Sequence, residues 1–148
     1  MAYITIVEAD AILAAKVSKA AWTAATTQQK DAALAEATEI IDRLAYVGNK
    51  YSETQVNQFP RDVAAVTEVP TEVEKACAYI ALSILEGKDL EQMYASQSIT
   101  STQYETAKVT YNRMRLPAHI MLGIPSVTAW RYLMQFLRDP RGIRVVRG

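Results

Sequence analysis

The chain has 148 residues, half of them hydrophobic, and its sixteen basic and sixteen acidic side chains give a formal net charge of zero. This length allows one domain whose core needs no metal or disulfide, and the low content of glycine and proline excludes a disordered chain. No apolar run approaches the ~20 residues of a membrane span, and Glu8 and Asp10 interrupt the N-terminal segment where a secretory signal would be apolar. We therefore expect a soluble protein that is made and kept in the cytoplasm.

The charges are unevenly distributed along the chain. Residues 1–110 contain nine Lys and Arg against fifteen Asp and Glu, whereas residues 111–148 contain seven Arg against one acid, Asp139. Such an asymmetry favours head-to-tail assembly as readily as nucleic-acid binding, and a solvated C-terminal face is the simplest alternative.

The first predicted helix begins at Thr5. Thr5 and Glu8 have the Ser/Thr-x-x-Glu spacing of a capping box, in which each side chain satisfies a backbone N–H of the other residue. Leu13, Val17 and Ala20 would then lie on one face of this helix.

A second helix is predicted after Thr26-Thr27. Its apolar residues recur at helical spacing, and Gly48 can supply the left-handed residue that stops it. The apolar stripe consists of Leu34, Ala37, Ile41 and Leu44.

A third helix is predicted from a second capping box, in the segment Pro70-Thr71-Glu72-Val73-Glu74, to about Gly87. Because it is apolar on most sides, we expect it at the centre of the core. A fourth helix should begin near Pro125-Ser126, end before Asp139-Pro140, and carry the stripe Trp130, Leu133, Met134 and Leu137.

The segment between the third and fourth helices has a different pattern. It is rich in Ser, Thr and Gln, and Ala107, Val109 and Tyr111 then alternate with polar residues as in a strand. We therefore predict a mainly α protein: a bundle of about four helices over residues 1–138, with a helix-free loop or β-hairpin excursion over about 93–125. An extended C-terminal arm would follow over residues 139–148.

Residues for catalysis are scarce. The only histidine, His119, lies in an apolar segment, and we interpret Cys77 as a small buried hydrophobic residue. The sequence contains neither a Gly-rich phosphate-binding loop nor Cys and His residues at the spacing of zinc ligands. The sequence therefore predicts no enzyme, no catalytic residue, no cofactor and no metal site.

The loop between the second and third helices ends in Phe59-Pro60-Arg61. We interpret these residues as a rigid elbow, in which Phe59 fills the gap between the two helices. Arg61 would be free to pair with an acid such as Asp42 or Glu72.

A family resemblance rests on the order of several segments. These are a YITIVEADA opening, a Trp in AAWTAAT, the helix AALAEATEIIDRL, the loop ending in QFPR, and VPTEVEKACAYIALSILEG. In this order they resemble the head-to-tail connector (adaptor) proteins of tailed bacteriophages, many of which carry the label DnaT-like single-stranded-DNA-binding. The resemblance covers residues 3–87, and more loosely the strand at 109–111 and the closing helix.

The resemblance implies a structural virion protein without catalytic residues, made in the bacterial host and located in the neck of the virion at the portal vertex. Such subunits form a dodecameric ring between the portal and the tail or a second connector protein. The ring extends the channel for packaged double-stranded DNA, and helps to retain the genome until ejection. No membrane is involved.

Two segments are the predicted contact sites in such a ring. The arm would dock on the portal, because its arginines can pair with carboxylates while its apolar residues are buried. Its residues are Arg138, Arg141, Ile143, Arg144, Val145, Val146 and Arg147, and the excursion would contact a neighbouring subunit or the tail through Tyr104, Val109, Tyr111, Arg113 and Arg115.

The alternative function is a single-stranded-DNA-binding replication accessory protein. The basic arm would attract phosphate, but it lacks the aromatic residues on which single-strand binders stack bases. A generic helical interaction module of the host is a third alternative.

Overall fold

The structure is a computed structural model that describes residues 1–63, 67–98, 101–104, 107–110 and 117–141. Its elements, in chain order, are α1 (Ile6–Ala14), α2 (Ala20–Ala24), α3 (Thr27–Asp42), α4 (Thr71–Leu85), α5 (Leu90–Ser98), β1 (Ser101–Tyr104), β2 (Ala107–Thr110), α6 (Ala118–Met121) and α7 (Val127–Leu133). The predicted mainly α fold is confirmed.

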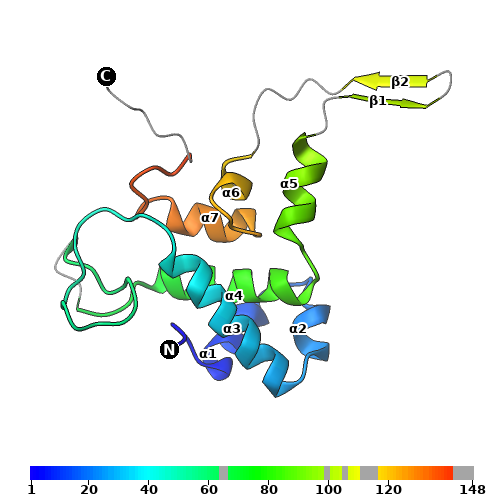
Figure 1. The fold of residues 1–148 in the computed structure, drawn as a ribbon. Coiled ribbons are helices and arrows are strands. Elements are labelled where there is room, and N and C mark those ends of the chain that lie inside the picture. Colours follow the sequence, from blue (N-terminus) through cyan, green and yellow to red (C-terminus); the bar gives the residue numbers. More distant parts are fainter. Residues whose placement is uncertain (64–66, 99–100, 105–106, 111–116, 142–148) are drawn as a thin grey trace, which may run out of the picture.

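The helix α4 forms the centre of the fold. It contacts α1, α2 and α3 on one side and α7 on the other, so that it lies between two layers of helices (Figure 1). Eight of its fifteen residues are buried, among them Val73, Cys77 and Ile80. The prediction of a central third helix is therefore confirmed. This helix is central because its apolar surface is too wide for one neighbouring helix to cover.

Two helices, α1 and α3, begin with a capping box. Thr5 and Glu8 form the predicted capping box at α1, with the Thr5 backbone N–H donating to the Glu8 carboxylate over 2.7 Å. Thr26 and Gln29 form the same arrangement at α3.

The capping box predicted at the start of α4 is wrong. Pro70 is the N-cap, no side chain caps the helix, and the Pro70 carbonyl accepts from the Val73 backbone N–H at 2.9 Å. Thr71 is the first helical residue, one position too late to be a cap. The fixed φ of Pro70 directs the chain into the helix instead.

The first helix is shorter than predicted. It ends at Ala14, Val17 is fully exposed, and Ala20 begins the separate helix α2. The break allows Trp22 to be buried while its indole N–H donates to the Asp10 carboxylate over 2.6 Å. Burial of this large ring outweighs continuation of the helix.

The second helix also ends before its predicted stop. It terminates at Asp42 with Arg43 as its C-cap, so Gly48 belongs to the loop that follows. Gly48 has φ of +76°, and a Cβ there would lie 2.6 Å from the Asp62 carboxylate oxygen. This glycine therefore serves the loop and not the helix.

The last helix stops at Leu133, although the predicted stripe continued to Leu137. Leu137 is buried because it forms an antiparallel bridge with Tyr46, and Met134 is partly exposed. The Val47 N–H donates to the Phe136 carbonyl over 2.9 Å, and the Arg138 N–H donates to the Ala45 carbonyl over 3.0 Å. These backbone hydrogen bonds join segments that are distant in the sequence, and they replace the final helical turn.

The predicted excursion is confirmed in its centre and wrong at both ends. The strands β1 and β2 form an antiparallel hairpin, with Ser101 opposite Thr110 and Tyr104 opposite Ala107. Residues 93–98 belong to α5, and α6 occupies residues 118–121, so the thirty-residue stretch without helix does not exist. The hairpin extends away from the helical body beyond the end of α5 (Figure 1).

The capping difference between two exposed threonines gives a test. We expect Thr26→Ala to lower the free energy of unfolding by about 1 kcal/mol, because it removes the side-chain acceptor of the α3 cap. Thr71→Ala at α4 is the matched control and should change the unfolding free energy by less than about 0.5 kcal/mol. Urea unfolding followed by circular dichroism measures both, and equal losses would contradict the assigned caps.

Candidate functional surfaces

The elbow that follows α3 is held by a cluster of aromatic rings. Phe59 is only 3% exposed and meets the rings of Tyr46, Phe136 and Tyr3 edge-on, with ring centroids 4.7, 5.4 and 6.2 Å away. It thus joins the N-terminal segment and the segments after α3 and α7, and not only the second and third predicted helices. Edge-to-face contacts of this kind add to the burial of the ring.

A half-buried polar contact fixes the same cluster. The Tyr3 hydroxyl donates to the Asp42 carboxylate, which also accepts from the Gln58 backbone N–H over 3.0 Å. Burial, and then the bond to Asp42, raise the pKa of the Tyr3 phenol well above its usual value. The pKa of Tyr46 is also raised, mainly by burial.

Arg61 does not pair with Asp42 or Glu72, which corrects the prediction from sequence. Its guanidinium donates to the carbonyl oxygens of Val47 and Gly48, and to the Gln58 side-chain oxygen over 2.8 Å. The reason is that Asp42 is already occupied by Tyr3 and Gln58. Arg61 therefore organises the backbone of the loop.

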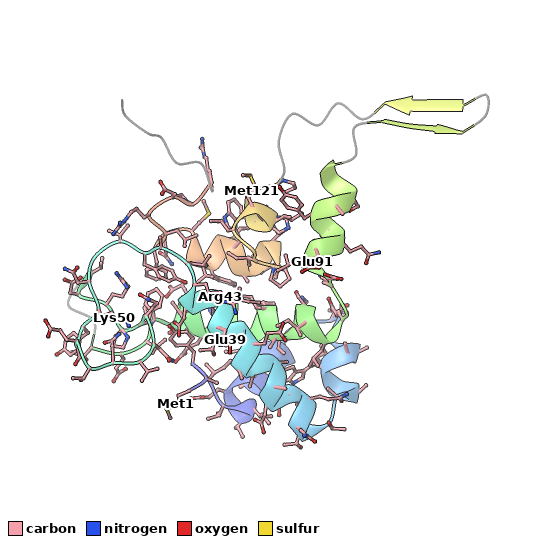
Figure 2. All side chains as sticks on the ribbon, in the orientation of Figure 1. Met1, Glu39, Arg43, Lys50, Glu91 and Met121 are labelled. Atoms are coloured by element: carbon pink, nitrogen blue, oxygen red, sulfur yellow. The ribbon has the colours of Figure 1, made fainter. Side chains whose placement is uncertain are left out.

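The two ends of the loop are joined by backbone pairing at Lys50. Lys50 pairs with Arg61 in an antiparallel bridge, and the Tyr51 N–H donates to the Pro60 carbonyl over 3.1 Å. Figure 2 shows Lys50 within this loop, beside the layers of helices. The elbow is thus a folded unit and not an open connection.

A groove of about 320 Å³ lies beside the elbow. Its walls are mostly apolar, with polar groups from Arg61, Glu72 and Gln135, and its apolar lining is Val47, Phe59, Val63, Pro70 and Phe136. Val47 and Val63 are exposed.

The predicted contact residues of the arm and excursion are only partly described. Tyr104 and Val109 lie on β1 and β2, opposite Ala107 and Thr102. Arg138 and Arg141 are exposed at the end of the described chain. The remaining residues of these two predicted sites lie outside the described residues: Tyr111, Arg113, Arg115, Ile143, Arg144, Val145, Val146 and Arg147.

The chain is still attached to the body at Pro140, where the predicted arm would already have begun. The Trp130 indole N–H donates to the Pro140 carbonyl over 2.8 Å, and Asp139 and Pro140 are partly buried. Any free segment therefore begins after these residues.

A surface of two lysines and two tyrosines was not predicted from the sequence. The rings of Tyr79 on α4 and Tyr132 on α7 stack at 5.9 Å with an angle of 14° between their planes. The Lys16 ammonium lies 4.9 Å from the Tyr79 ring centre, and the Lys75 ammonium lies 5.7 Å from that of Tyr132. We call these four residues the Lys/Tyr surface.

Only two of the four residues of this surface have a sequence spacing that places them together. Lys75 and Tyr79 are four residues apart, so they share a face of α4, but Lys16 lies in the segment between α1 and α2, and Tyr132 lies on α7. Cation–π contacts of this kind are attractive but weak at exposed sites, at about 0.5–1 kcal/mol.

The structure gives no indication of a metal centre within the described ranges. No group of three His, Cys, Asp or Glu there could hold an ion, and no described helix is long and apolar enough to span a membrane. Burial, and then the charge of Lys88, lower the pKa of His119. Burial raises the pKa of the Cys77 thiol to about 11, as expected of a packed residue.

The chain matches the model of a known protein family. A family model described as "Putative DnaT-like ssDNA binding protein" matches residues 2–148. Neither the curated proteins nor the solved structures contain a significant match.

The aromatic cluster predicts a large effect at the elbow. Phe59→Ala should lower the free energy of unfolding by about 3–5 kcal/mol, because it removes a ring that is enclosed by three others. Val56→Ala, in the same loop but 83% exposed, is the control and should stay within about 0.5 kcal/mol of the wild type. A small loss for Phe59→Ala in chemical denaturation would show that the cluster is not part of the stable core.

Alkaline pH should destabilise the fold. The folded pKa values of Cys77, Tyr3 and Tyr46 are raised, so their contribution is complete at neutral pH and is lost once the unfolded chain begins to ionise, from about pH 9 upward. We expect the free energy of unfolding to fall by about 1–3 kcal/mol between pH 8 and about 10.5. Urea midpoints that do not change over this range would contradict the burial of these groups.

Proposed function

The chain belongs to the DnaT-like ssDNA-binding protein family, and we propose that within this family it is a structural subunit of a phage head-to-tail connector. In this role, copies form a ring, the dodecamer that the resemblance implies, between the portal and the tail or a second connector protein. The ring would surround the packaged double-stranded DNA in the neck of the virion. Its work would be association, without catalysis.

The observation that carries this proposal is the isolated hairpin. Among the described residues, β1 and β2 form a sheet only with each other, and they project from the helical body (Figure 1). A two-stranded hairpin alone in water is marginally stable at best, and its outer edges present unpaired backbone groups. Packing against another protein chain would satisfy both needs.

The uneven charge supports association between copies. Residues 1–110 carry an excess of acids and residues 111–148 an excess of arginines, so the basic segment of one copy is complementary to the acidic body of the next. A heterologous contact of this kind generates a ring when the rotation between copies closes. Each contact can be weak, because a ring presents many copies of the arm to a portal at once.

Single-stranded-DNA binding is the second candidate function. The family description favours it over a connector role, since that description names ssDNA and no virion part. The Lys/Tyr surface combines the cationic and aromatic groups that such proteins use. In this function the chain would be a replication accessory protein.

Electron microscopy of the purified chain, with and without the portal, tests the connector proposal. We expect rings or portal caps for the wild type. Replacement of residues 101–110 by a Gly/Ser linker should abolish them without changing the helical circular dichroism, because the core, among residues whose burial the structure describes, is built from the helices and the elbow loop. Val17→Ser, which changes a fully exposed residue elsewhere, is the control and should assemble normally.

Removal of residues 142–148 in the same experiment addresses the arm. This truncation keeps Pro140, the acceptor of the Trp130 indole N–H, so the helical body should remain folded. Rings should still form but should no longer bind the portal. A wild-type chain that stays monomeric and ignores the portal, yet shows a salt-sensitive shift of single-stranded DNA, would replace the connector by the second candidate.

A further inference from the structure

We infer that the Lys/Tyr surface (Lys16, Lys75, Tyr79 and Tyr132) is a contact site for single-stranded nucleic acid, with the lysines on phosphates and the tyrosines beneath bases. This inference rests on the second candidate function and locates it on the helical body. The basic C-terminal arm, which the sequence suggested first, is not required for it.

Lys16 and Lys75 have no ion-pair partner among the described residues, as is also true of Lys19 and Lys50, but Lys16 and Lys75 each lie over a tyrosine ring. Of the ion pairs within the described residues, one joins Lys30 to Asp10 at 3.4 Å and another joins Lys88 to Glu86 at 3.2 Å, but none includes Lys16 or Lys75. Their ammonium groups instead face tyrosine rings. A lysine held by a weak cation–π contact can turn to a phosphate without first breaking a salt bridge.

Lys30 provides the contrast within the same protein. Its ammonium lies 5.0 Å from the Trp22 ring centre, so it makes the same type of cation–π contact. It also pairs with Asp10, which accepts from the Trp22 indole N–H. A carboxylate therefore already pairs with the lysine at the Trp22 site, whereas no carboxylate in the described ranges pairs with Lys16 or Lys75.

The tyrosines supply a rigid platform. Both are partly exposed, and both pack against the buried core of α4 and α7, so their rings are fixed before any ligand arrives. Each ring already contacts the other tyrosine and a lysine ammonium, so a base can stack on it once that lysine has turned to a phosphate, and such stacking tolerates any sequence. A strand would thus be held by ring contacts and by two cations, without readout of particular bases.

Acidic residues limit the length of this surface. Burial, and then the charges of Glu8 and Glu68, raise the pKa of Glu74, which indicates that carboxylates gather at the N-terminal end of α4. They would repel a phosphate backbone on that side. Only a short stretch of strand can therefore lie on the four residues.

Fluorescence anisotropy with a labelled oligothymidylate, measured on the full chain over a series of salt concentrations, tests the inference. The double variant Lys16→Ala/Lys75→Ala should weaken binding about tenfold at low salt. It should also reduce the slope of log K against log salt by about 1.4, since each lost phosphate contact on a single strand contributes about 0.7. Tyr132→Leu should weaken binding about tenfold while leaving the slope unchanged, because stacking releases no counterions.

Lys30→Ala is the matched control. It removes a lysine that makes the same cation–π contact, and we expect the affinity and the slope of the wild type. Thermal unfolding of every variant verifies that the fold is retained. If the wild type binds but the double variant has the same affinity and slope, the Lys/Tyr surface is not the site, although the second candidate function stands. If the wild type shows no binding even at low salt, the second candidate function fails with it.

Discussion

The burial of α4 on nearly all sides is the constraint on which this fold depends. Because Val73, Cys77 and Ile80 are fully enclosed, α1, α3 and α7 have little freedom in position, and the loops between them must fit the space that remains. The elbow at Phe59 is the clearest example of a loop that fits this remaining space. Its aromatic ring closes the end of the core, and the loop backbone is then held by Arg61 and by the contact of Tyr3 with Asp42.

The two candidate functions use different parts of the molecule. The connector proposal uses the projecting hairpin and the arginine-rich C-terminal sequence, whereas DNA binding uses side chains that the helical layers hold in place. The family description favours DNA binding, and the projecting hairpin favours association with another protein chain. The two functions also need different nucleic acids, because a connector channel carries double-stranded DNA whose bases are already stacked, whereas the Lys/Tyr surface needs the free bases of a single strand.

Most of the helical fold could be predicted because helical periodicity is local. The stripe that includes Leu34 and Ile41 and the apolar surface of α4 were recognised correctly. The errors came from interactions between distant residues. Trp22 ends α1 early by reaching Asp10, and Leu137 leaves the last helix to pair with Tyr46. For the same reason, the Lys/Tyr surface was invisible in the sequence, since three separate segments supply its residues.

The hydrogen bond from the Trp130 indole to the Pro140 carbonyl determines how far from α7 the last arginines can lie. It anchors the chain at Pro140, and Arg147 comes seven residues later in the sequence. At about 3.3–3.6 Å per residue, a tether of that length has a radius of at most about 25 Å. Any partner that the terminal arginines bind must therefore present its carboxylates or phosphates within one small-domain diameter of α7.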